Sequence, residues 1–331
     1  MSRFGACILD ADELRLRSDE KALFRDADPF GFILFARNID TPDQVRALCG
    51  DLREAVGRDA PITIDQEGGR VQRLRSPHWR EWLPPLEHVT LAGDHAARSM
   101  YIRSRLISDE LRAIGIDSNC APLVDVAGPD THPFLLNRCY GTVPDVVADI
   151  GRAVADGHLD GGVLPVVKHI PGHGRALADS HLELPVIDAD PEDLQDTDFA
   201  PFRALNDLPM AMTAHLVYAR LGNSPATTSS QIMQIIREDI GFDGLIMTDD
   251  ISMKALNGSL SEIATASLQA GCDVVLHCNG TFAERVVVAE ASGTMTDAAQ
   301  SRAERALVAR KTPDEVDIPA LEAELAALMN G

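Results

Sequence analysis

Eight short apolar runs recur along the chain, and longer amphipathic segments separate them. Each run is rich in Val, Ile or Leu and lacks strict alternation, which is typical of strands buried on both faces. Eight strands alternating with helices predict an α/β fold, a closed parallel (β/α)8 TIM barrel. A doubly wound open sheet is the alternative, but no GxGxxG or phosphate-loop motif favours it. The runs are Ala6–Leu9, Gly31–Phe35, Ile62–Ile64, Ser118–Val124, Leu164–Val167, Met210–Thr213, Leu245–Met247 and Val274–Leu276.

Start and stop signals mark the helices between these runs. Thr41 followed by Pro42 is typical of a helix N-terminus, and Gly271 follows a helical pattern where a left-handed residue is expected. The acidic, Ala/Leu-rich stretch at about 313–330 predicts a closing helix outside the barrel. With no low-complexity linker between the runs, residues 1–331 are interpreted as a single catalytic domain.

Composition bears more on partners than on fold. The chain has 51 acidic and 30 basic residues, a formal net charge of −21. Such a chain repels phosphate backbones, so nucleic acid is not an expected partner, and an anionic ligand would need local Arg or Lys. No stretch approaches the ~18 apolar residues of a membrane span, and the first ten residues lack a signal-peptide layout. A cytoplasmic protein without membrane association is expected, and its six cysteines, none in a CxxC pair, are expected to be reduced.

Polar and mostly ionisable side chains end all eight runs. The carboxyl ends of the strands form the active-site face of a TIM barrel, so these side chains predict a polar pocket there. Each one taken singly could also be a loop residue or a helix cap. The residues are Asp10, Arg37, Asp65, Asp125, Lys168, His169, His215, Asp249, Asp250, His277 and Asn279.

The segment 168–181 concentrates three His, one Asp and two Gly after the fifth run. Glycines give such a loop the freedom to move. Asp179 and His181 are close enough to form a carboxylate–imidazole pair, which can transfer protons near neutral pH. Zinc bound by this pair together with His169 and His173 is the alternative, but the spacing matches no usual zinc pattern. We therefore expect no metal and no cofactor.

Two other segments deliver carboxylates to the same end. Asp249 and Asp250 follow the seventh run, and because side chains alternate along an extended chain, one should enter the pocket while the other caps or supports it. The pattern does not choose between them. Near Asp65, a Gly68-Gly69 turn can fold the chain back so that this carboxylate and an Arg both meet a polyhydroxylated ligand.

Together these segments resemble the family 3 glycoside hydrolases, and within them the short bacterial β-N-acetylglucosaminidases. Six motifs in the same order make the resemblance specific, from about Gly31 to Asn279. They stand here as Gly31-Phe-Ile-Leu-Phe-Ala-Arg-Asn38, Asp65-Gln-Glu-Gly-Gly-Arg-Val-Gln-Arg73, Ala121-Pro-Leu-Val-Asp-Val126, Lys168-His-Ile-Pro-Gly-His-Gly174, Asp179-Ser-His181 and Thr248-Asp-Asp-Ile-Ser-Met253.

The resemblance implies a retaining mechanism with Asp249 as the nucleophile that forms a covalent glycosyl-enzyme. His181, supported by Asp179, would be the general acid/base. The implied activity is that of an exo-acting β-N-acetylhexosaminidase (EC 3.2.1.52), which removes non-reducing-end GlcNAc from peptidoglycan fragments, GlcNAc-1,6-anhydro-MurNAc and its peptides, in cell-wall recycling. The implied sugar-binding residues are Asp65, Arg73, Arg138, Lys168 and His169.

The resemblance is weakest in the segment 128–141. Cys139 replaces the usual Ser after Arg138, and residues 128–134 differ from the common form. A β-glucosidase or β-xylosidase of the same family, or a non-catalytic muropeptide-binding sensor, are the alternatives to a β-N-acetylglucosaminidase. A monomer or weak dimer is expected.

Overall fold

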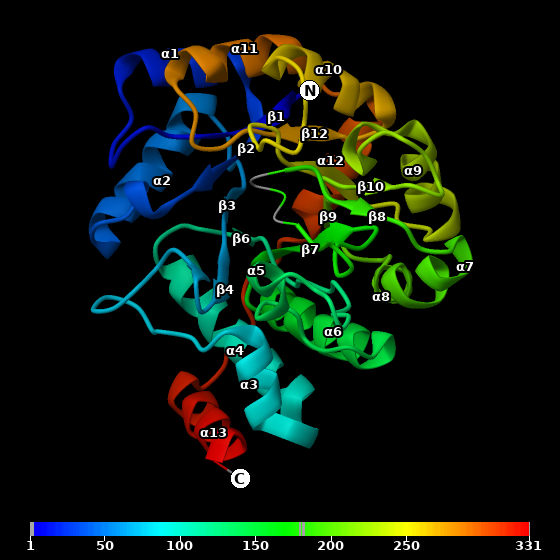
Figure 1. Cartoon of the computed structure of the whole chain (residues 1–331). Coiled ribbons are helices and arrows are strands. Elements are labelled where there is room, and N and C mark those ends of the chain that lie inside the picture. The colour runs from blue at the N-terminus through cyan, green and yellow to red at the C-terminus, as the bar shows by residue number, and fades with distance from the viewer. Residues whose placement is uncertain (1–2, 179, 181–182, 331) are drawn as a thin grey trace.

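The computed structural model describes residues 3–178, 180 and 183–330. Eight parallel strands close into a barrel in the order β1-β12-β11-β9-β7-β6-β3-β2 (Figure 1). The predicted (β/α)8 barrel is therefore confirmed, and the open sheet is excluded. The strands are β1 (Gly5–Asp10), β2 (Pro29–Leu34), β3 (Ile62–Ile64), β6 (Ser118–Asn119), β7 (Leu164–Ile170), β9 (Met210–Thr213), β11 (Leu245–Asp250) and β12 (Val274–Leu276).

One strand is much shorter than the apolar run that predicts it. The run 118–124 forms strand only over Ser118–Asn119, followed by a single bridge from Leu123 to Lys168. Pro122 has no N–H to donate to a neighbouring strand, which interrupts the ladder. The rest of this run is buried without being regular strand.

Helices surround the barrel and begin at recognisable signals. The Thr41 side chain accepts a hydrogen bond from Gln44 N, and Gly271 ends its helix with a φ of 122°. Both positions were predicted from the sequence. The longer helices are α1 (Ser18–Ala27), α2 (Pro42–Val56), α3 (Pro85–Ala92), α4 (Ala96–Ala113), α6 (Pro144–Asp160), α10 (Leu260–Ala270), α11 (Phe282–Ser292) and α12 (Asp297–Ala309).

The C-terminal helix α13 (Ile318–Asn330) packs on α3 and α4 (Figure 1). It begins later than the predicted start near 313. Asp314 N donates to Asp160 O at 2.8 Å, and Asp314 O accepts from Arg105 at 2.6 Å. These bonds hold the chain extended against the barrel, so the helix starts only after it.

Alternate strand residues fill the barrel interior, while their neighbours pack against the helices. This filling leaves no channel through the barrel, so a ligand can enter only at the mouth formed by the strand ends. The buried interior residues include Ala6, Ile8, Leu164, Val166, Met210, Met212, Leu245, Met247, Val274 and Leu276.

Short elements build the walls of that mouth. The hairpin of β4 (Gln66–Gly68) and β5 (Val71–Gln72) follows β3, and the four-residue helix α5 (Pro133–Leu136) lies after β6. In the described part of the chain, no helix is long and apolar enough to cross a membrane. All six cysteines lie in that part, and each is buried and outside any disulfide.

Candidate active site

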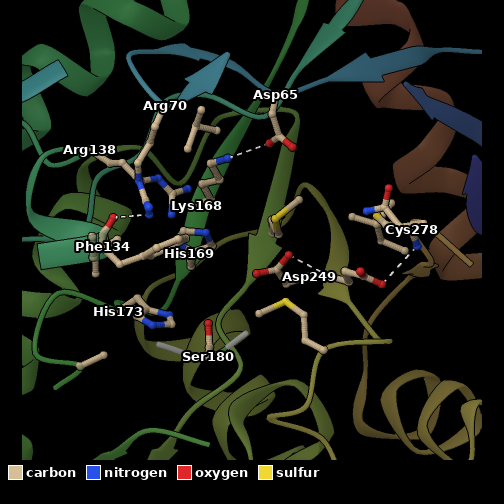
Figure 2. A pocket seen from close by; sticks show the side chains of 18 of the residues that line it. Asp65, Arg70, Phe134, Arg138, Lys168, His169, His173, Ser180, Asp249 and Cys278 are labelled. Carbon is tan, nitrogen blue, oxygen red and sulfur yellow. Dashed lines mark hydrogen bonds and ion pairs between the residues drawn. The ribbon is translucent and has the colours of Figure 1, made fainter. Parts of the chain in front are cut away.

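A cavity of about 340 Å³ opens at the carboxyl ends of the strands (Figure 2). The six described residues that the family resemblance assigns to the site all line it. The polar lining residues are Asp65, Arg70, Arg73, His132, Arg138, Lys168, His169, His173, Ser180, Asp249, Asp250 and Asn279. Residues up to 214 positions apart in sequence thus meet in one polar pocket, as expected for this end of a barrel.

Lys168 is the centre of an ion-pair network in this cavity. Its side chain is 2 % exposed, and its Nζ lies 3.1 Å from Asp65 Oδ1 and 2.6 Å from Glu67 Oε1. Arg73 Nη2 lies 2.9 Å from Asp65 Oδ2, and Arg138 donates two hydrogen bonds to Glu67 at 2.8 and 2.9 Å. The network holds charged donors and acceptors in fixed positions, which suits sugar hydroxyls.

The charges in this network keep one another ionised. Burial acts to raise the pKa of Asp65, but attraction to Lys168 and Arg73 outweighs it and holds that pKa well below its usual range. Burial also acts to lower the pKa of Lys168, and Glu67 and Asp65 raise it instead. These groups therefore stay charged across the physiological pH range.

Sequence reasoning gave no role to Glu67. It stands two positions after Asp65, so an extended chain presents both on one face, and this spacing was a usable signal. The local turn depends on Gly68, whose φ is 113° and where a Cβ would lie 1.8 Å from Arg103 Nη2. Buried Arg103 donates to the carbonyl oxygens of Glu67 and Leu83 through this gap.

Asp125 holds the histidine-rich segment in place. Its Oδ2 lies 2.7 Å from His169 Nδ1, and its Oδ1 accepts hydrogen bonds from His173 N at 2.7 Å and His169 N at 3.2 Å. Because Asp125 occupies Nδ1, His169 would meet a ligand through Nε2. Burial and the neighbouring His169 lower the pKa of His173 to about 4, so this imidazole is neutral at neutral pH.

Asp249 and Asp250 divide their roles as the alternation of side chains predicts. Asp249 is directed into the cavity (Figure 2). Burial acts to raise the pKa of Asp249, but attraction to His215 and His169 outweighs it and lowers that pKa below its usual range. Asp250 accepts hydrogen bonds from Ser252 N, Ser252 Oγ and Cys278 N at 2.7 to 3.1 Å. Both carboxylates line the cavity, but Asp249 faces it as an ionised group, whereas the oxygens of Asp250 accept hydrogen bonds that cap the following turn.

The chain matches the model of the glycosyl hydrolase family 3 N-terminal domain over residues 8–308. This chain belongs to glycosyl hydrolase family 3. The expected family and the expected enzyme class, a glycoside hydrolase, are confirmed.

Relatives within family 3 share both sequence and fold with the chain. A β-hexosaminidase of Methylococcus capsulatus is 38 % identical over 272 residues, which cover 80 % of each chain. NagZ from Neisseria gonorrhoeae superposes with a TM-score of 0.85 and 29 % identity, covering 99 % of this chain and 96 % of that one. A family 3 β-N-acetylglucosaminidase from Paenibacillus has the same TM-score at 28 % identity, covering 98 % of this chain and 68 % of that one.

The acid/base pair expected from the resemblance lies outside the described residues. Asp179 and His181 are the two positions concerned, while Ser180 between them lines the cavity. The same two residues are also two of the four candidate zinc ligands, so that set is only partly among the described residues. Among the residues that are described, no group of three or more His, Cys, Asp or Glu could hold a metal ion.

Some strand-end residues do not reach the family 3 pocket, contrary to prediction. Asp10 is fully buried and forms ion pairs with Arg285 and Arg37, which join β1 to α11 and to the turn after β2. His277 is also fully buried. Neither side chain lines the cavity, and Asp10 instead ties neighbouring elements of the barrel mouth together.

The unusual Cys139 lies behind the cavity wall. It is fully buried, its Sγ donates to Leu135 O at 3.5 Å, and it packs in a small cluster with Leu123 and Ala127. The preceding segment instead places Phe134 and Leu135 on the cavity side. The departure from the family pattern therefore lies in the packing behind the wall, while Arg138 itself lines the cavity.

Asp250 is expected to make stability depend on pH. Burial raises its pKa from 3.8 to about 6 in the folded chain. Folding thus disfavours its charged form, and this opposition to folding weakens as the pH falls from about 6 toward 3.8. From about pH 7.5 to about pH 5, the free energy of unfolding of the wild type should rise relative to Asp250→Asn, as measured by urea denaturation. A constant difference over this range would contradict the assignment.

Proposed function

We propose that the chain is an exo-acting, retaining β-N-acetylglucosaminidase that removes non-reducing-end GlcNAc from peptidoglycan fragments. The observation that carries the proposal is an ionised Asp249 facing a small pocket of fixed charges at the barrel mouth. Relatives named β-hexosaminidase and β-N-acetylglucosaminidase support the choice of sugar. The filled barrel interior closes the pocket floor, which favours terminal sugars over internal ones.

In the proposed reaction, Asp249 attacks the anomeric carbon and forms a covalent glycosyl-enzyme. His181, oriented by Asp179, donates a proton to the leaving oxygen and then removes one from the attacking water. The other carboxylates described in the cavity are committed, since Asp65 is paired with Lys168 and Asp250 caps Ser252. This commitment favours a histidine over a second carboxylate as the acid.

Binding of the terminal GlcNAc is assigned to five residues. In the proposal, the Asp65 carboxylate accepts hydrogen bonds from sugar hydroxyls, and the cationic neighbours of Asp65 donate them. His169, fixed by Asp125, contributes Nε2. The assigned residues are Asp65, Arg73, Arg138, Lys168 and His169.

The His181→Gln variant is expected to separate activated from unactivated substrates. Acid assistance matters most when the leaving group is poor, so hydrolysis of a 4-methoxyphenyl glycoside should slow about 10²–10⁴-fold. Hydrolysis of the 2,4-dinitrophenyl glycoside should slow by less than about tenfold in the cleavage step. The measurement is kcat/KM for each substrate. Equal losses on both would argue against the acid role.

Product analysis on purified muropeptides tests the proposal as a whole. The expected products are GlcNAc, released as the β-anomer before mutarotation, and the anhydro-muramoyl remainder. Faster hydrolysis of the matching glucoside or xyloside would favour the alternative specificities, and saturable binding without turnover would favour the sensor.

We further propose a cytoplasmic location and a monomer or weak dimer. Six buried, unpaired cysteines fit a reducing compartment. Size-exclusion chromatography with light scattering measures the oligomeric state.

A further inference from the structure

Arg70 and Phe134 form a stacked pair at the rim of the pocket (Figure 2). Arg70 is exposed at the tip of the β4–β5 hairpin, and Phe134 is carried by α5. The guanidinium carbon lies 3.3 Å from the centroid of the Phe134 ring, and Arg70 Nη2 donates to Phe134 O at 2.7 Å. A flat cation is therefore held in one orientation at the mouth.

This rim pair connects to the buried ion pairs below it. The Phe134 ring centroid lies 5.7 Å from the guanidinium carbon of Arg138, which makes two hydrogen bonds to Glu67. Arg138 and Lys168 are buried, and Arg73 is partly exposed beside Asp65. Arg70 is thus the cation that the described cavity presents most openly to solvent.

A cation in this place changes which leaving groups can approach. The formal net charge of −21 repels an anionic ligand at long range, so a local cation is needed to offset it. The closed pocket floor takes the terminal sugar, so the leaving group must extend toward the mouth where Arg70 lies. A guanidinium matches a carboxylate with two parallel N–H donors.

We propose that Arg70, stacked on Phe134, binds a carboxylate of the leaving group and so selects anionic aglycones. In the proposed substrate this is the lactyl carboxylate of the muramic acid, or a carboxylate of its peptide. The inference rests on the proposed function and adds to it the recognition of the second sugar.

A matched pair of substrates isolates this contact. One is GlcNAc-β-1,4-anhydro-MurNAc with its free lactyl carboxylate, and the other is the lactyl methyl ester of the same disaccharide. The ratio of kcat/KM between acid and ester measures selection for the carboxylate, because the reacting bond is the same. In Arg70→Gln this ratio should fall about tenfold, as expected for one exposed charge-assisted contact.

Arg25→Gln is the matched control variant. Arg25 lies on the outer helix α1, its side chain is 67 % exposed, and it pairs with Asp26. Its loss makes the same change in net charge, so the ratio should stay at the wild-type value. Arg70→Lys should restore part of the ratio, since it keeps the charge without the planar stacking. Circular dichroism melting confirms that each variant is folded.

The outcomes separate the two proposals. A ratio that is unchanged in Arg70→Gln, or that falls equally in Arg25→Gln, overturns the role of Arg70 and leaves the glycosidase proposal standing. If the wild-type chain releases GlcNAc from neither disaccharide nor an aryl glycoside, the proposed function fails and this inference fails with it.

Discussion

The Asp249→Asn variant is expected to lose about four orders of magnitude in kcat on an aryl β-N-acetylglucosaminide. An amide is a very poor nucleophile, and the ionised carboxylate that faces the pocket has no described substitute. The substitution keeps the size of the side chain, so the fold should persist. Steady-state kinetics with the 4-nitrophenyl glycoside measures the loss.

Asp250→Asn is the control for this prediction, because it changes a carboxylate on the same strand at the next position. Asp250 contacts Ser252 and Cys278, so its loss should lower kcat by no more than about tenfold.

Labelling gives a second test of the nucleophile. A fluorinated substrate that is turned over slowly should add the mass of its sugar to the peptide that carries Asp249 in the wild type. Near-wild-type turnover by Asp249→Asn, or labelling elsewhere, would refute the nucleophile assignment.

Lys168→Met is expected to have the largest effect on stability. It leaves Asp65 and Glu67 as neighbouring carboxylates without the cation between them, which should lower the free energy of unfolding by about 3–5 kcal/mol at neutral pH. Because Asp65 and Glu67 have lowered pKa values in the wild type, their contribution is present at neutral pH and is lost as the pH falls. Urea denaturation should therefore show a deficit that keeps its size down to about pH 4.5 and shrinks as the pH is lowered further.

Lys21→Met provides a matched comparison on the surface. The Lys21 side chain is 41 % exposed, and its Nζ lies 3.5 Å from Asp51. Exposed pairs contribute about 0–1 kcal/mol, so this variant should remain close to the wild type. A similar loss in both variants, or a Lys168→Met deficit that does not change with pH, would contradict the network described for the pocket.

The barrel could be predicted because its signals are local. Runs of Val, Ile and Leu without alternation identify strands covered on both faces, and all eight contain a strand. The errors arose where a backbone group has a distant or missing partner. Pro122 cannot donate to the ladder, and Asp314 bonds to Asp160 and Arg105, which are far away in sequence.

The pocket was only partly predictable, because strand ends give the position of a side chain but not its partner. Glu67 meets an arginine 71 positions away, and Asp125 meets a histidine 44 positions away. Because of these pairings, both acids hold other side chains of the site in position. Conversely, Asp10 ends a strand as Asp65 does, yet Arg285 draws it into the packing between β1 and α11. The pattern alone also left Asp249 and Asp250 equivalent until the bonds of Asp250 were known.

The reactivity of the buried cysteines can measure how often the barrel opens locally. Burial raises the pKa of Cys7 and Cys49 to about 12, and the pKa of Cys278 beside the pocket lies well above its usual range. Since only an accessible thiolate reacts quickly, each of these thiols stays unreactive until the structure around it opens. The rate at which a thiol reagent captures each one therefore counts openings of that part of the barrel. The labelling rates of the six cysteines, which are spread from β1 to the loop after β12, would show which parts of the barrel open most often. The same rates measured with a bound sugar would show whether the sugar slows that opening.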